Sequence, residues 1–361
     1  MDFFTNIFSV LGIPMGWVLG WLYKGVGNYF GALFLFTLLM RMVTFPISLK
    51  SQKSQADRIK LAPRLERLQK KYGQDRQKMQ QKQQELYEKE GVSMAAGCLP
   101  SVIQMVLLFA MIAVIYAPLT SLSGIPKDAV AIITNASVEG KDANAQKKDK
   151  SYIELKALQR LDNAGQREKL FAALTAEKDG KPMYTAVEVN KYLDKMQHML
   201  NRDFKLGGAI NLLDYPNKGF GWLWLLPIIS GLTSLATSWL MSFYQKRGTS
   251  GEKQPGQGCM TVMTLLLMPG FSLYITFTVP GAVGLYWIFS NVIAIAQTVI
   301  LNKIYDPRKI REQAVIDDEE RRRRRAEDKK KLKSAGKPSG ADLSGADSSG
   351  DTASLPADEE N

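Results

Sequence analysis

The stretch that decides the fold is FGALFLFTLLMRMVTFPISL, residues 30–49. Arg41 is its single charged residue, and no other charge occurs among the 25 positions between Lys24 and Lys50. About 20 apolar residues suffice for a helix to cross a bilayer. A guanidinium at that depth costs roughly 2.5–3.5 kcal/mol, so an arginine kept there normally faces a polar cavity and marks function. The stretch therefore predicts a membrane-spanning helix with a functional arginine.

Arginine can instead extend its head group to the membrane surface, where the charge stays hydrated. Here the apolar run continues beyond Arg41 to Leu49, which adds about 12 Å of helix at 1.5 Å per residue. That length favours a cavity around Arg41, although the sequence leaves both interpretations open.

Three more stretches carry no charge, namely Gly91–Pro126, Gly219–Gln245 and Gln254–Asn302. The first two have room for one span each, and the third, with 49 residues, for two spans joined by a turn at Pro280–Gly281. Apolar segments of this length must satisfy their backbone internally as helices. We therefore predict an all-α polytopic membrane protein. Its five expected spans are residues 28–49, 98–117, 222–243, 260–279 and 281–302.

The loops between these spans indicate their orientation. Ile47–Gly97 holds eight Lys and four Arg against two Asp and four Glu, a net charge of 12 − 6 = +6. Short loops rich in Lys and Arg stay in the cytoplasm. We therefore expect residues 50–97, 244–259 and 303–361 inside, and residues 1–27 and 118–221 outside.

The segments outside the spans have their own patterns. Residues 50–97 predict a cytoplasmic helical hairpin, although a solvated linker fits its thin apolar stripe nearly as well. Residues 118–221 show helical periods at 152–161, 167–176 and 186–204, which predicts a small helical subdomain. Residues 1–27 suit a helix on the outer membrane surface, with no secretory or organellar targeting pattern.

Catalytic chemistry is not expected. His198 is the single histidine, which removes histidine triads and multi-histidine metal sites from the spans. The sequence has neither a phosphate-binding loop of the GxxxxGK type nor a glycine-rich dinucleotide fingerprint. We predict no enzyme, no metal and no cofactor.

Polar residues within the spans are the candidate site. They are Thr37, Arg41, Gln104, Asn291 and Gln297. Thr37 precedes Arg41 by four residues and so shares its helix face. Any one of these groups taken alone is more often a hydrogen-bond partner between helices than a substrate contact.

The tail carries five consecutive arginines, Arg321, Arg322, Arg323, Arg324 and Arg325, before a Ser- and Gly-rich end from Ser334 that predicts disorder. The arginine run suits contact with a polyanion, either ribosomal RNA or anionic lipid. A purely topological role is comparably consistent with it.

Six motifs occur in one order along the chain. They are TLLMRMVTFPISLKSQKSQ (37–55), LQKKYG (68–73), QELYEKEGV (84–92), GCLPSVIQM (97–105), WLLPIISGLTS (224–234) and VPGAVGLYWIFSN (279–291). This set resembles the YidC/Oxa family of membrane protein insertases, across all five spans and the hairpin.

The resemblance implies a five-helix core around a hydrophilic groove that opens to the cytoplasm and the lipid. By motif, Arg41 matches the groove arginine, Thr37 the polar residue one turn before it, and Tyr286 and Trp287 the aromatic pair of the last span. Incoming segments would slide past the second and fourth spans. The absence of a large domain before the core implies a Gram-positive-type bacterial member.

The function implied is a membrane protein insertase and chaperone of the bacterial plasma membrane, with the N-terminus outside and the C-terminus inside. Its expected partners are nascent membrane proteins, the bilayer, the ribosome through the basic tail, and the Sec translocon and signal recognition particle pathway. A transporter or channel using the same cavity is the alternative. It would require a through-pore or a coupled ion site, and the sequence shows no inverted repeat.

Overall fold

The computed structural model of the chain describes residues 2–92, 99–138, 153–163, 165–178, 181–206, 210–248 and 263–335. The chain forms two compact units, Met1–Val315 and Ile316–Asn361. Disorder is predicted from Ser334, but Ser334 and Ala335 are helical. The rest of that end, most of the connector at 244–259 and the first residues of the second and fourth predicted spans lie outside the described residues.

The decisive stretch lies in α2 (Tyr29–Lys60), which begins at a capping residue. The Asn28 side chain accepts a hydrogen bond from the Gly31 amide at 2.7 Å, as N-cap residues do. The helix then runs through Pro46 without interruption for 32 residues, about 48 Å at 1.5 Å per residue. The first predicted span and the start of the predicted hairpin are therefore one continuous helix.

The hairpin consists of α3 (Ala62–Tyr72) and α4 (Arg76–Lys89). The Asp75 side chain caps α4 by accepting a hydrogen bond from the Lys78 amide at 3.1 Å. A small core joins the two helices, formed by Leu61, Leu65 and Tyr87. Glu66 of α3 lies 3.8 Å from Arg311, in the first turns of α15 (Pro307–Ala335). The hairpin is thus tied both to α2 and to the start of α15.

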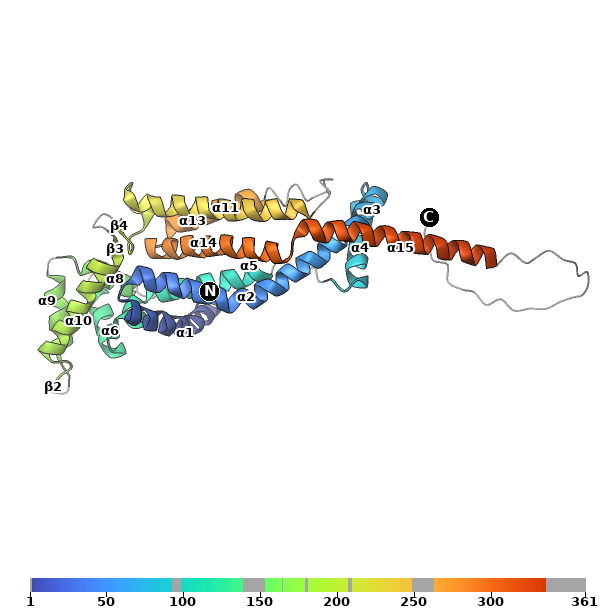
Figure 1. Ribbon diagram of the computed structural model, residues 1–361. Helices are drawn as coiled ribbons and strands as arrows, with labels where there is room; N and C mark the ends of the chain where they lie inside the picture. The colour runs from blue at the N-terminus through green and yellow to red at the C-terminus, as the bar shows by residue number, and fades with distance from the viewer. Residues whose placement is uncertain are drawn as a thin grey trace, which may run out of the picture. The chain divides into compact units, whose positions relative to one another are not determined.

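The apolar helices form two groups, which Figure 1 shows lying lengthwise beside one another. One contains α1 (Asp2–Val26), α2 and α5 (Leu99–Tyr116), and the other contains α11 (Leu225–Arg247), α13 (Met268–Thr278) and α14 (Gly281–Ile304). The groups meet where α2 packs on α14. The rings of Phe30 and Phe34 stand edge-on to Phe289 there, with centroids 4.9 and 5.4 Å apart.

The second group is held by small polar side chains. Ser230 Oγ of α11 lies 3.1 Å from both Ser272 Oγ and Thr276 Oγ1 of α13, and all three side chains are buried. Small residues allow helices in a membrane to approach closely, and their hydroxyl groups bond across the interface.

Pro269 lies in the first turn of α13, after the π-helical turn η7 (Met263–Leu267). Proline is tolerated in the first turn of a helix.

The described residues between 118 and 221 fold into a connector domain. Its elements are η2 (Leu119–Ser123), α6 (Lys127–Val138), α8 (Ile153–Arg160), α9 (Gln166–Thr175), β1 (Glu177–Lys178), β2 (Lys181–Pro182), α10 (Ala186–His198), η4 (Met199–Phe204), β3 (Lys205–Leu206), β4 (Ile210–Asn211) and η5 (Pro216–Lys218), with η6 (Trp222–Trp224) next. The strands form two short antiparallel hairpins, β1–β2 and β3–β4. The three expected helical periods coincide with α8, α9 and α10–η4.

The core of the connector domain is continuous with that of α1, α2 and α5. Within the domain, Glu154 of α8 is bound to η2, the first element after α5, because its carboxylate accepts hydrogen bonds from Thr120 N at 2.9 Å and Thr120 Oγ1 at 2.5 Å. Burial raises the pKa of this carboxyl group, and the bonds from Thr120 oppose that shift.

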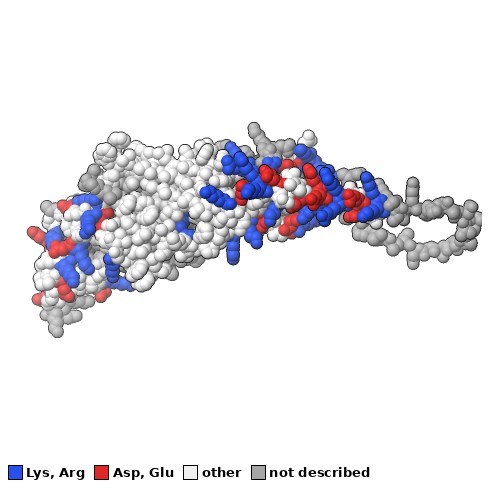
Figure 2. Space-filling model, viewed as in Figure 1, with Lys and Arg blue, Asp and Glu red and all other residues white. Residues whose placement is uncertain are grey.

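Among the described residues, three helical stretches are long and apolar enough to cross a membrane, and they begin at Tyr29, Trp222 and Gly281. Val102–Tyr116 and Leu265–Thr278 are shorter apolar helices. Figure 2 shows a largely uncharged surface over α11, α14 and the first part of α2, between the charged surface of the connector domain and a second charged surface at the other end of these helices. The chain is an all-α polytopic membrane protein, as the sequence predicts.

Candidate functional site

Arg41 is the 13th of the 32 residues of α2 and reaches α14 across the contact between these two helices, here called the seam. Its Nη2 donates hydrogen bonds to Ser290 Oγ at 2.6 Å and to the Ser290 carbonyl oxygen at 2.9 Å. The guanidinium therefore points toward α14.

Ser290 is the centre of this polar cluster. Its Oγ also accepts a hydrogen bond from Gln104 Nε2 of α5 at 3.2 Å. Tyr286, one turn earlier on α14, hydrogen-bonds with both Gln104 and Ser290. Because Ser290 is only 3% exposed, these bonds form in the interior, where an unpaired polar group is costly. The cluster links α2, α5 and α14.

The charge of Arg41 has no acidic partner in the part of the chain that the structure describes. A guanidinium carries five N–H donors, and only its Nη2 is bonded in the described structure. No acidic side chain among the described residues forms an ion pair with it. The cluster therefore holds a positive charge in an apolar bundle and leaves Nε and Nη1 available.

The other sequence candidates lie around the cluster without joining it. Thr37 is buried, and its Oγ1 donates to the Leu33 carbonyl of the same helix at 2.7 Å. Trp287 packs partly buried against the main core, and Gln297 is half-buried farther along α14. Asn291 turns to the other side of α14, where its Nδ2 donates to Thr233 Oγ1 of α11 at 3.3 Å.

Asn291 should therefore contribute to packing rather than to the site. Replacing Asn291 with alanine is expected to reduce the free energy of unfolding by about 0.6 kcal/mol, a typical value for a hydrogen bond between membrane helices. Any activity that depends on Arg41 should stay unchanged. Thermal unfolding in detergent, beside an activity assay, checks both parts. A large loss of activity without a loss of stability would instead place Asn291 in the site.

Ser290 is the residue that the sequence did not single out. A serine in an apolar helix is a weak signal, because serine is common at helix contacts. Its spacing could have identified it as a candidate, because Ser290 follows Tyr286 by four residues and so lies on the same face of α14.

Near the connector domain, the contact between α2 and α14 is closed by residues 203–206 and 210–214. The buried Asp203 carboxylate accepts hydrogen bonds from the Tyr23 hydroxyl group and, at 3.1 Å, from the Tyr29 amide. The carbonyl oxygens of Leu212 and Asp214 accept from the first free amides of α14, Ala282 N at 2.9 Å and Gly281 N at 3.0 Å. One short segment thus joins the start of α2 to the start of α14.

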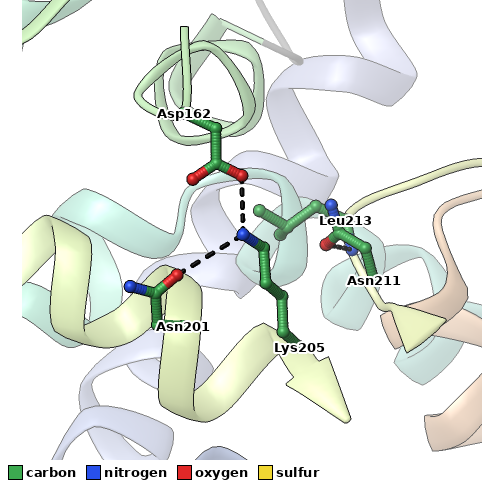
Figure 3. A network of polar contacts seen from close by, with 5 residues as sticks. All are labelled: Asp162, Asn201, Lys205, Asn211 and Leu213. Atoms are coloured by element: carbon green, nitrogen blue, oxygen red, sulfur yellow. Dashed lines mark hydrogen bonds and ion pairs between the residues drawn. The ribbon is translucent and has the colours of Figure 1, made fainter. Parts of the chain in front are cut away.

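Figure 3 shows the network beside this segment. Lys205 Nζ donates to Asp162 Oδ2 at 2.6 Å and to Asn201 Oδ1 at 3.4 Å, and Asn211 Oδ1 accepts from the Leu213 amide at 3.1 Å. The Lys205–Asp162 pair is partly exposed, so it should contribute little by itself.

Replacing Asp203 with alanine is expected to lower the free energy of unfolding by about 2–3 kcal/mol, because the buried Tyr29 amide and the partly buried Tyr23 hydroxyl group lose their acceptor. Asp162→Ala is the matched control, for which a loss of less than about 1 kcal/mol is expected for an exposed pair. Thermal unfolding in lipid nanodiscs would compare them. Equal losses of stability in the two variants would show that Asp203 does not stabilise this contact.

The basic tail belongs to the second unit and is helical through Arg325. Glu320 precedes Arg324 by one turn, and their charged groups lie 3.7 Å apart. The acids Asp317–Glu320 each stand four residues before an arginine, a spacing that stabilises exposed helices. These acid–arginine pairs stabilise the helix, whereas the five arginines without nearby acids would destabilise it by mutual repulsion.

A family model described as the 60Kd inner membrane protein matches residues 21–309. Several similar proteins carry the name membrane protein insertase YidC. One from Aromatoleum aromaticum is 42% identical over 96 residues, which is 27% of this chain and 18% of the relative. Relatives from Methylobacillus flagellatus and Nitrosococcus oceani are 39% and 41% identical over 103 residues, in each case 28% of this chain and 19% of the relative.

These alignments thus span less than a fifth of each relative's length. The family match includes Arg41, Gln104 and Ser290, whereas Arg321–Arg325 and most of α1 lie outside it.

Proposed function

Because the chain belongs to the family of the 60Kd inner membrane protein, the YidC/Oxa family, we propose that it inserts proteins into the membrane and assists their folding. The observation that carries this proposal is the unneutralised Arg41 charge, held by Ser290 inside an apolar bundle. A charge at membrane depth is costly to insert, so an arginine kept there is a candidate functional residue.

The proposed mechanism lowers the barrier for a short polar segment that must cross the hydrocarbon. Arg41 lies in the proposed hydrophilic groove and attracts acidic groups of that segment through its free Nε and Nη1 donors, because Coulomb attraction is stronger at a protein site than in bulk water. No covalent bond changes, so the step requires no catalytic residue, metal or cofactor. The protein is accordingly proposed not to be an enzyme.

The apolar part of the substrate would leave sideways along α5 and α13. Both helices expose large apolar side chains, Val102, Met105, Val106 and Phe109 on α5, and Phe271 and Tyr274 on α13. The four on α5 fall at intervals of three and four residues and form one face. Burial of the substrate helix in lipid then drives its release.

We further propose that the connector domain lies outside the cytoplasm, and that the hairpin and α15 lie inside. The net charge of +6 in residues 47–97 supports this orientation. The proposed spans are the membrane parts of α2, α5, α11, η7–α13 and α14.

Reconstitution into proteoliposomes tests the function. Insertion of a single-spanning substrate, measured by protease protection, should require the protein, while solute and ion flux should match empty liposomes. Flux without insertion would instead support the transporter or channel. Adding or omitting the Sec translocon and signal recognition particle in the same assay shows whether either is needed.

The tail is proposed to bind the ribosome. Removal of residues 316–361 is expected to weaken co-sedimentation of translating ribosomes, and the difference should shrink as salt rises, because counterion release drives contact with RNA phosphates. Equal binding of the truncated and full-length proteins at low salt would contradict this role. Binding to anionic vesicles alone would assign the arginines to lipid.

A further inference from the structure

One short helix of the connector domain, α8, is hydrogen-bonded to segments that lead into two different apolar helices. Its Leu155 and Leu158 are buried in the main core, so the helix has a fixed position in the domain. The first of its polar ties is Glu154, whose carboxylate accepts hydrogen bonds from the amide and the hydroxyl group of Thr120 in η2. Because η2 begins three residues after α5 ends, this tie holds the end of α5.

The second tie of α8 holds the start of α14. Five residues after the first tie, Gln159 Nε2 donates hydrogen bonds to the Leu213 carbonyl oxygen at 2.7 Å and to Asp214 Oδ1 at 3.1 Å. The carbonyl oxygen of Asp214 in turn accepts from the Gly281 amide of α14 at 3.0 Å. A Cβ atom on Gly281 would lie 3.4 Å from Leu212 Cα, so the backbone of α14 lies directly against this segment. Gln159 therefore positions residues 211–214 against α14.

The helices α5 and α14 are also joined directly, through the polar cluster. Gln104 Nε2 of α5 donates to Ser290 Oγ of α14 at 3.2 Å, while the main contacts of α14 are with α11 and α2. Ser290 follows Gly281 by nine residues, which is about 13.5 Å along the helix at 1.5 Å per residue. The two helices are thus held together at two levels, by their own side chains at the cluster and through α8 at the connector domain.

We propose that α8 acts as a clasp between α5 and α14, in which Glu154 and Gln159 position the ends of these helices so that the polar cluster stays closed to water and ions on the side of the connector domain. Water enters a space that is roomy enough and offers it polar partners, so separation of the two ends would open a hydrated path to Ser290. The exposed face of α5 from Val102 to Phe109 lies beyond the clasp and stays accessible. The inference does not depend on insertase activity, because it concerns the passive barrier alone.

Leak of potassium ions from proteoliposomes, measured without a substrate protein, tests the clasp. With the unchanged protein, the leak should be as low as in empty liposomes. Gln159→Ala should raise it about tenfold, because two lost hydrogen bonds shift the equilibrium between closed and open ends by about that factor. Arg167→Ala is the matched control, since Arg167 pairs with Asp194 within the connector domain and both side chains are exposed. Equal leak in the two variants would overturn the proposal.

A buried position next to the clasp gives a second readout. Val283, the third residue of α14, is 0% exposed, so a thiol there is shielded from a charged maleimide while the two ends stay together. The chain for this test carries Val283→Cys, Cys98→Ser and Cys259→Ser in lipid nanodiscs. It should stay unlabelled, whereas the same chain with Gln159→Ala should react. Thermal unfolding shows that both chains are folded at the labelling temperature, and protection of the thiol in the folded Gln159→Ala chain would overturn the proposal.

A covalent replacement of the clasp separates positioning from packing. In the chain with Cys98→Ser and Cys259→Ser, the changes Gln159→Cys and Asp214→Cys place two thiols where the side chains bond at 3.1 Å. Before crosslinking, this chain should leak as Gln159→Ala does. A short thiol crosslinker should return the leak to the level of the unchanged protein, because a covalent link replaces the lost hydrogen bonds. Persistent leak after complete crosslinking would reject the clasp, and so would a low leak before it.

Discussion

Replacing Arg41 with alanine is expected to lower insertion of a substrate with an acidic translocated segment by about tenfold or more. Two unit charges 4 Å apart interact by about 4 kcal/mol at an effective dielectric constant of about 20. Roughly a third of that energy already corresponds to about tenfold in rate. A substrate with a neutral segment should be affected much less, because it gains little from the charge.

Arg41→Lys is the matched variant. Lysine keeps the charge but loses the planar fork that can hold Ser290 and reach a substrate together. It should therefore retain much of the activity on the acidic substrate. Both variants are compared at equal membrane levels. Stability should not explain the loss in alanine, since removing a charge from the bundle offsets the lost hydrogen bonds.

Two outcomes would contradict this role of Arg41. Equal insertion of the acidic substrate by Arg41→Ala and the unchanged protein would remove the electrostatic role. Equal failure of lysine and alanine would show that the geometry of the guanidinium, and not its charge, is what the site requires.

The sequence predicted the class of the protein, an all-α polytopic membrane protein, because hydrophobic length is a local signal. The apolar run around Arg41 and the helical periods within residues 152–204 required no tertiary information. The partner of Arg41 could not be read in the same way, since Ser290 is 249 positions away and contributes only a hydroxyl group and a carbonyl oxygen.

In the connector domain, too, the sequence indicated the helices but not the contacts between distant residues. Its helical periods were visible, but nothing local marked Asp203 as the acceptor for Tyr23 and Tyr29. An acid beside basic residues reads as an ordinary surface charge in the sequence. Its burial depends on the start of α2, which packs over it only in the folded chain.

Ser290→Ala is expected to reduce insertion of the acidic substrate about fivefold, because Arg41 and Gln104 lose the shared Oγ acceptor and each such bond is worth about 1 kcal/mol. The carbonyl of residue 290 still accepts from Nη2, so the effect should be smaller than that of Arg41→Ala. Ser290→Thr keeps an Oγ and should restore most of the activity.

A double-mutant cycle shows whether Ser290 acts through Arg41. If Ser290 positions the guanidinium, Ser290→Ala should have little further effect once Arg41 is alanine, since coupled residues are not additive. Ser230→Ala removes an equally buried hydroxyl group at the α11–α13 contact and should lower stability without changing the preference for acidic substrates. Additive losses at residues 41 and 290, or an equal loss of preference in Ser230→Ala, would mean that Ser290 only packs helices together. A non-additive cycle, with unchanged stability of the Ser290→Ala variant, would instead show that Ser290 positions the Arg41 guanidinium.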